Sequence, residues 1–276
     1  MATLRNGILT ATAILIAAVF VCSCAGRSRE KSPSSPPPPP QDDLETEVSV
    51  IVNLAESGPL SEGIRTMEQY ALRLAAFHAS NPGSKDVPEI VSLVRKYLFD
   101  GASPLRDEDL YLPFVSVVCE MYPEGSPERI VPQWEKAMCS MNRVGSKAAD
   151  FVFMGPDGRR GHLYGVEGDP LILVFGNPDC AACKELIAAF EADPVLLDTA
   201  VLSMYIDEDV DAWRSHLGDY PSSWTLAYDP AMVLRGNTLY HIPAIPSVYL
   251  LSADKTVLLK DKSVSAVLHY LNTTLR

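Results

Sequence analysis

The chain has 276 residues, enough for two modest domains, and 47% of them are apolar, enough for packed cores. Its formal net charge of −12 argues against nucleic acid as a partner, because phosphate binding needs a basic face. The same charge argues against electrostatic adhesion to anionic lipid, so attachment to a membrane needs another device.

Residues 1–23 have the features of a signal peptide. An apolar run from Gly7 to Val21 follows Arg5, and it is shorter than the ~20 residues that span a bilayer. The run ends in Val21-Cys-Ser-Cys24, which resembles the lipobox of bacterial lipoproteins. This resemblance implies that Cys24 is the lipidated first residue of the mature protein; an ordinary secretory signal cleaved nearby is the alternative. Both interpretations place the mature protein in an oxidising compartment where disulfides persist.

Residues 24–42 form a linker rich in proline and serine, with five consecutive prolines at 36–40. Proline-rich segments stay extended at about 3.1 Å per residue. We therefore expect a semi-rigid stalk that holds the folded part away from the membrane.

Residues 43–141 have a helical pattern. Ile64, Met67, Ala71 and Leu74 recur at spacings of three and four, and prolines and glycines divide the segment, which indicates four or five packed helices. Asp107 is a candidate start for one of them. The segment contains no nucleophile–base set, so we expect it to select clients rather than to carry chemistry. We expect Cys119 and Cys139 to be buried thiols, although the sequence leaves a disulfide between them open.

Residues 142–276 alternate between strand and helix patterns. We expect a hairpin at 150–164, a buried strand at 171–175, a helix at 183–191, a strand at 200–206, a helix at 210–217, a hairpin at 246–260 and a helix at 264–275. Strands joined through helices imply a partly parallel central sheet covered on both faces.

The pair Cys180-Ala-Ala-Cys183 follows the buried strand and Pro178. A cysteine at a helix N-terminus is favoured as thiolate by unpaired N–H groups and the helix dipole. Cys180 is therefore the expected nucleophile, and Cys183, one turn deeper, the resolving thiol. Pro246 precedes the strand of the last hairpin and lacks an N–H, which leaves neighbouring backbone groups to pair with a substrate peptide.

Two segments resemble known families. Phe175-Gly-Asn-Pro-Asp-Cys-Ala-Ala-Cys183, followed by Ile245-Pro-Ser-Val-Tyr-Leu-Leu251, resembles the thioredoxin-like domains of the TlpA/ResA type. The segment from Tyr97 to Pro113 resembles a helical domain of unknown function that precedes such domains in Bacteroidota lipoproteins. The resemblance implies an α/β thioredoxin fold, a central mixed sheet flanked by helices, preceded by a small all-α domain. It also implies a cis peptide bond at Pro246 facing a redox disulfide, Cys180–Cys183.

Around the cysteines the sequence departs from thioredoxin. Val174 stands where thioredoxin has a buried aspartate that assists the resolving thiol, and Asp179 disfavours the neighbouring thiolate. No histidine lies between the cysteines, which favours a reductant-like site. We expect Pro178, Asp179 and Ile245 to contact substrate. His241 is a further candidate near the site.

The function indicated is a membrane-anchored periplasmic thiol–disulfide oxidoreductase without cofactor or metal, served by an upstream membrane electron donor and acting on client proteins with disulfides or thiols. Other interpretations of the pair are an inert disulfide or a structural zinc site, although no second C-x-x-C supplies further ligands. A peroxiredoxin would need Ser or Thr where Asn177 stands. The alternative function is a binding or scaffold lipoprotein whose helical domain captures a partner and whose thioredoxin-like domain is structural.

Replacing Cys24 with Ala should release the protein from membranes and stop its labelling with fatty acid, because Cys24 occupies the lipidated position of the motif. Cell fractionation and metabolic labelling measure both, with Cys22→Ala as the matched control. If Cys22→Ala loses the label and Cys24→Ala keeps it, the lipidated cysteine is the other one.

Overall fold

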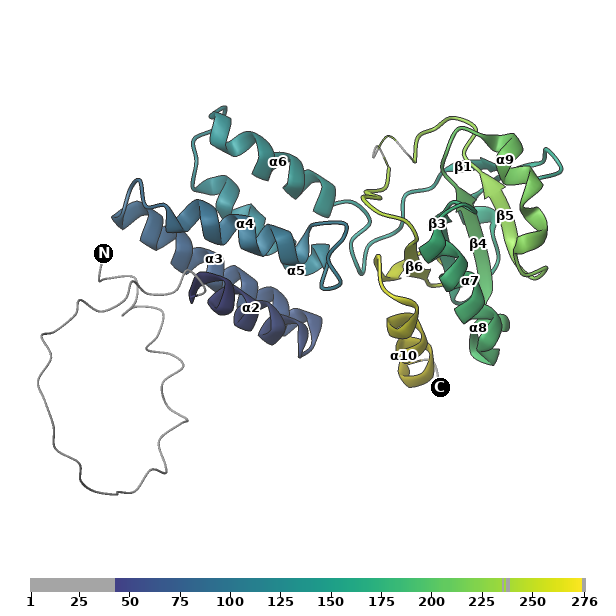
Figure 1. Cartoon of the computed structure of the whole chain (residues 1–276), viewed down its shortest axis with the longest axis horizontal. Helices are drawn as coiled ribbons and strands as arrows, with labels where there is room; N and C mark the ends of the chain where they lie inside the picture. The colour runs from purple at the N-terminus through teal and green to yellow at the C-terminus, as the bar shows by residue number, and fades with distance from the viewer. Residues whose placement is uncertain (1–42, 235, 237–238, 275–276) are drawn as a thin grey trace, which may run out of the picture.

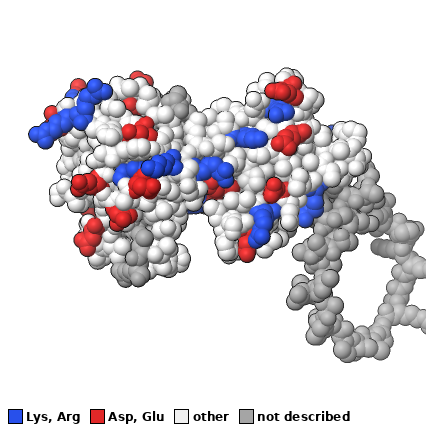
Figure 2. Space-filling model, turned by 180° about the vertical axis from the view of Figure 1, so that it is seen from behind, with Lys and Arg blue, Asp and Glu red and all other residues white. Residues whose placement is uncertain are grey.

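The computed structural model describes residues 43–274 apart from 235, 237 and 238, and these residues form two lobes side by side (Figure 1). The expected signal peptide, Cys24 and the linker at 24–42 lie outside the described residues. Among the helices that are described, none is long and apolar enough to cross a membrane. In the view of Figure 2, Lys/Arg and Asp/Glu side chains are interspersed over both lobes.

The first lobe is helical, as the periodicity predicted. It contains α2 (Asp43–Glu56), α3 (Leu60–Ser80), α4 (Asp86–Leu98), α5 (Glu108–Glu120) and α6 (Pro127–Cys139). Met67, Ala71 and Leu74 of α3 belong to one buried apolar core shared by these helices. Asp107 caps α5, since its carboxylate accepts a hydrogen bond from the Leu110 N–H at 3.0 Å. The predicted helix start is therefore confirmed.

The second lobe contains a mixed sheet, which in the described part of the chain has seven strands in the order β2-β1-β5-β4-β3-β6-β7. The strands are β1 (Val152–Met154), β2 (Arg160–His162), β3 (Leu171–Gly176), β4 (Ala200–Tyr205), β5 (Thr225–Tyr228), β6 (Ser247–Leu251) and β7 (Val257–Leu259). The helices are α7 (Ala181–Ala192), α8 (Pro194–Leu197), α9 (Val210–Ser215) and α10 (Val264–Thr274), with short 3-10 turns at Leu163–Gly165 and Leu217–Asp219. Strands β3, β4 and β5 are parallel, whereas β6 is antiparallel to β3.

Strand β3 is buried on both faces, as its continuous apolar run predicted. Ile172 and Val174 face a core that includes Phe190 of α7 and residues of α8 and α10. Leu173 and Phe175 face a second core on the other side of the sheet. The end of β3 is thus held between two packed cores. This fixes the position at which the loop to Cys180 begins.

Two elements were not expected from the sequence. Strand β5 has four residues and follows Pro221-Ser-Ser-Trp224, so it offers too few positions for an alternating pattern to stand out. Helix α8 is a single turn that begins at Pro194. The order inferred from the sequence therefore lacked a strand that lies between β1 and β4 in the sheet.

The two lobes have separate apolar cores, but a buried network of charged groups joins them. The Glu108 carboxylate at the start of α5 is central, with its side chain 2% exposed. Across the interface it accepts a hydrogen bond from His241 Nδ1 and lies 2.8 Å from Lys260 Nζ. Further pairs between the lobes are Arg106–Asp261, Asp107–Lys262 and the contacts of Lys260 Nζ with the carbonyls of Cys139 and Met141.

Opposing effects act on the pKa of Glu108. Burial is the largest and by itself raises the pKa, but the hydrogen bond from His241 and the charges of Lys260 and Arg106 outweigh it and bring the pKa to about 2. Because this value is below the ordinary 4.5, ionised Glu108 stabilises the folded state above about pH 4.5. That stabilisation is lost as the pH falls from about 4.5 towards 2.

Glu108→Gln should therefore lower the free energy of unfolding at pH 7 by about 3 kcal/mol, the scale of a broken buried ion pair. Between pH 4.5 and 2 the difference from the wild-type protein should shrink, because protonation removes the same charge. Urea unfolding across this pH range measures it. A difference that stays constant down to pH 2 would contradict the role of the Glu108 charge.

Candidate redox site at the start of helix α7

Cys180 is the N-cap residue of α7. Its backbone is extended (φ −76°, ψ 122°), and its Sγ accepts a hydrogen bond from the Cys183 N–H at 3.3 Å. This donor is one of the N–H groups that the first helical turn leaves unpaired, and it is directed at the sulfur. The structure thus places the first cysteine at the helix N-terminus, as the sequence predicted, although the helix begins at Ala181, two residues earlier than expected.

Cys183 lies in the first turn of α7, and only 6% of its surface is exposed. Burial, together with the hydrogen bond to Cys180, raises the pKa of the Cys183 thiol to about 12, while the Asn177 backbone N–H acts in the opposite direction. Gly176 makes room for this sulfur, since a Cβ at that position would lie 3.3 Å from Cys183 Sγ. Cys180 is partly exposed, so the two thiols differ in accessibility.

The segment before β6 approaches the cysteines from the other side. The Ile245–Pro246 peptide bond is cis, as the resemblance implied. The Ile245 carbonyl oxygen lies 3.6 Å from Cys180 Sγ. Pairing of Phe175 in β3 with Ser247 in β6 accounts for this proximity, because it brings the end of one strand beside the start of the other.

Asn177 organises the loop that presents Cys180, a role that the sequence analysis missed. Its Oδ1 accepts a hydrogen bond from the Asp179 N–H at 2.8 Å, its carbonyl accepts from the Cys180 N–H at 3.2 Å, and its Nδ2 donates to Asp207. The sequence did contain a signal for this role: an Asn between a predicted strand and a predicted helix start, where its side-chain amide can form hydrogen bonds with nearby backbone groups. Pro178 is buried and Asp179 is exposed.

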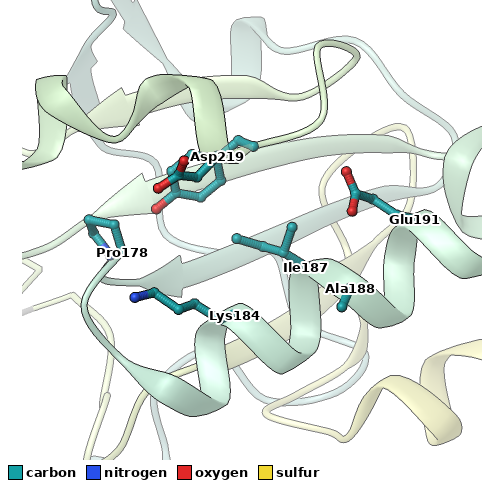
Figure 3. Close-up of a pocket in the computed structure, with 7 residues that line it drawn as sticks. Pro178, Lys184, Ile187, Ala188, Glu191 and Asp219 are labelled. Carbon is teal, nitrogen blue, oxygen red and sulfur yellow. The ribbon is translucent and has the colours of Figure 1, made fainter.

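A hollow of about 230 Å³ lies beside this loop. Figure 3 shows Lys184, Ile187, Ala188 and Glu191 on one side of α7, with Pro178 and Asp219 bordering the same hollow. Tyr220 also lines it. The pKa of Tyr220 is raised to about 12 by burial first and then by the negative charge of the Cys183 thiolate. No motif in the sequence indicated Tyr220.

A second hollow, of about 270 Å³, extends from Pro246 between α7 and the segment before α10. Glu185 and Lys262 border it with opposite charges, and Val248 contributes apolar surface. The surroundings of Pro246 thus include an open groove, which an extended peptide could follow towards Cys180.

Other candidates lie elsewhere. His241 makes its side-chain contacts with the helical lobe, and Val174 is a buried core residue. Cys119 and Cys139 are buried free thiols in the helical lobe. In the part of the chain that the structure covers, no group of three or more His, Cys, Asp or Glu side chains is arranged to hold a metal ion.

A central mixed sheet, a C-x-x-C pair that opens a helix and a cis-proline facing its first sulfur define the thioredoxin-like class. A crystal structure of a thioredoxin-like protein from Bacteroides caccae is 31% identical, with 83% of each chain covered and a TM-score of 0.76. The chain belongs to the thioredoxin-like proteins.

Two further solved structures each cover about half of this chain. The C-terminal domain of an uncharacterised Bacteroides fragilis protein is 39% identical over 48% of this chain and 98% of its own, with a TM-score of 0.46. The thioredoxin domain of a thiol–disulfide oxidoreductase from Bacteroides vulgatus is 14% identical over 49% of this chain and 99% of its own, with a TM-score of 0.42. No family model and no curated protein matches the sequence.

Limited alkylation of the reduced protein with iodoacetamide at pH 8 should modify Cys180 at least about tenfold faster than Cys183, because burial and a raised pKa suppress the Cys183 thiolate. Peptide mass spectrometry measures the two rates. The denatured reduced protein, in which both thiols should react alike, is the control. Faster labelling of Cys183 in the folded protein would reverse the assigned roles.

Proposed function

We propose that the protein is a periplasmic, lipid-anchored thiol–disulfide oxidoreductase that reduces or exchanges disulfides in client proteins. The observation that carries the proposal is the position of Cys180 Sγ, partly exposed at the N-cap of α7 and 3.6 Å from the Ile245 carbonyl oxygen, with Cys183 buried behind it. A helix N-terminus favours the thiolate form of a cysteine, which is the form that attacks disulfides.

The reaction follows from the two positions. The Cys180 thiolate attacks one sulfur of a client disulfide, forms a mixed disulfide and releases the other client sulfur as a thiolate. Cys183 then loses its proton and attacks Cys180 Sγ, which releases the second client thiolate and leaves a Cys180–Cys183 disulfide. The two protons of the dithiol end on the two client thiols, so two electrons pass to the client.

The loop before β6 serves as the client platform in this proposal. Pro246 has no N–H, so it cannot donate to a neighbouring carbonyl. The Ile245 carbonyl accepts from the Cys180 thiol at 3.6 Å, and its second lone pair can accept a hydrogen bond from an extended client. Pro178 and Asp179 directly precede Cys180 in the loop that leads into α7, and we assign them to the same platform. This arrangement holds the client disulfide next to the attacking sulfur.

Repeated turnover requires a reductant that restores the dithiol. We assign this role to an upstream membrane electron donor, since the expected lipid on Cys24 and the stalk at 24–42 would keep the protein at the membrane. The absence of a histidine between the two cysteines supports the reducing direction.

A binding or scaffold lipoprotein is the second candidate. Ile130, Val131 and Trp134 of α6 expose 65%, 54% and 47% of their surfaces, and apolar side chains grouped on a helix are typical of protein contacts. In this alternative the helical lobe captures a partner and the thiols are dispensable.

Reduction of insulin by the purified protein, with dithiothreitol as the final reductant, separates the two candidates. Cys180→Ser should lower the rate to that of dithiothreitol alone, while Cys119→Ala, which removes a buried thiol of the helical lobe, should keep the wild-type rate. In cells, Cys183→Ala should accumulate mixed disulfides through Cys180. Insulin reduction that survives in Cys180→Ser would remove the redox proposal.

A further inference from the structure

We propose that Glu108, in the helical lobe, is a positioning residue for the redox site. It acts by fixing the two segments that border Pro246: the loop at 241–245, which carries the Ile245 carbonyl, and the segment at 260–262. The proposal rests on the proposed function and extends it, because it makes the client platform a joint product of both lobes.

The loop between β5 and β6 needs external support. Its described residues between Asp229 and Pro246 belong to no helix or strand, and long loops hold a defined shape only through contacts made elsewhere. Its own lobe fixes the loop at 239–240: the Leu239 carbonyl accepts from Asn142 Nδ2, and the Tyr240 hydroxyl donates to the Ala149 carbonyl, both at 2.7 Å.

Beyond Tyr240 both lobes hold the loop: Ile242 and Ile245 pack against the apolar core of the second lobe, whereas the side chain of His241 is held by the helical lobe. His241 is 2% exposed, and its ring stacks on Phe99 at 5.2 Å between centroids and meets the edge of Trp134 at 5.8 Å. Its Nδ1 donates a hydrogen bond to Glu108 Oε1 at 2.5 Å. Since a carboxylate can only accept, this bond also fixes which ring nitrogen carries the proton. Four residues later, the Ile245 carbonyl faces Cys180.

The loop at 243–244 rests directly on the helical lobe. A Cβ added at Gly101, between α4 and α5, would lie 3.1 Å from the Pro243 carbonyl oxygen, 3.2 Å from its carbon and 3.3 Å from Ala244 Cβ. These distances leave no free space between the two backbones. A side chain at Gly101 would therefore push against the segment that ends at Ile245.

Glu108 also contacts the segment that forms the other border of Pro246. Its carboxylate lies 2.8 Å from Lys260 Nζ, and the adjacent residue Asp107 pairs with Lys262. Lys262 lines the groove that begins at Pro246. One helix start therefore contacts the segments on both sides of the platform through ion pairs, of which the Glu108–Lys260 pair is buried and Asp107–Lys262 is partly exposed. An interface that only fastened the lobes together would not need to reach both segments.

The experiment uses the full chain after the predicted signal and compares two kinds of disulfide. A peptide cyclised by a disulfide needs the backbone platform, whereas 5,5′-dithiobis(2-nitrobenzoic acid) needs only a reactive sulfur. Glu108→Gln removes the charge, and Gly101→Ala pushes the loop while leaving every charge in place. The matched controls are Glu135→Gln, a buried carboxylate paired with Arg95 and Tyr111 inside the helical lobe, and Gly58→Ala, whose nearest neighbour is the flexible Glu62 side chain at 3.4 Å.

We expect Glu108→Gln and Gly101→Ala to lower the peptide rate by about tenfold, the scale of a small misplacement of a reacting pair, and to change the aromatic disulfide rate by less than about twofold. Both controls should match the wild-type protein in both assays. Wild-type peptide rates in folded Gly101→Ala, or an equal fall in both rates, would overturn the proposal, even if Glu108→Gln fails to fold. A wild-type protein that reduces neither disulfide, or a Cys180→Ser variant as active as the wild type, would instead remove the proposed function.

Discussion

The antiparallel pairing of β3 with β6 is the constraint on which the site depends. It sets Phe175 opposite Ser247. The segment that leaves β3 towards Cys180 and the segment that enters β6 through Pro246 therefore lie side by side at the same end of the two strands. Both strands are buried in the middle of the sheet, between two apolar cores, and a slip of one residue would turn core side chains to the wrong face. The distance between Cys180 and the Ile245 carbonyl is therefore set by the packing of the whole second lobe.

The same packing divides the work between the two thiols. Cys180 is the N-cap of α7, and its sulfur accepts a hydrogen bond from one of the N–H groups of the first turn. Cys183 lies on the buried side of that turn. One sulfur is thus partly exposed at a helix N-terminus, which favours the thiolate, and the other is buried behind it. Gly176 completes the arrangement, because a side chain there would meet the Cys183 sulfur.

Local features of the sequence were enough to predict most of the fold and of the candidate redox site. The long apolar run of β3, the cap at Asp107 and the cysteine pair all have signals within a few residues, and the resemblance supplied the cis-proline. Strand β5 was too short to give a pattern. Tyr220 and the pairing of Glu108 with His241 could not be found, because they depend on segments far apart in the chain, 133 residues in the latter case. The separate cores of the lobes were foreseeable, but the charged interface was not.

That interface is informative because buried charges are a poor means of simple adhesion. Taking charges such as those of Glu108, Lys260 and Arg106 out of water costs several kcal/mol per ion, and apolar residues of similar size often hold two surfaces together as well or better. What a paired, hydrogen-bonded set of charges adds is direction, since each bond restricts distance and angle. Glu108, whose side chain is 2% exposed, lies where the helical lobe meets His241 and Lys260 of the two segments around Pro246. The charges are therefore better explained by the geometry that they impose on the platform than by the stability that they supply.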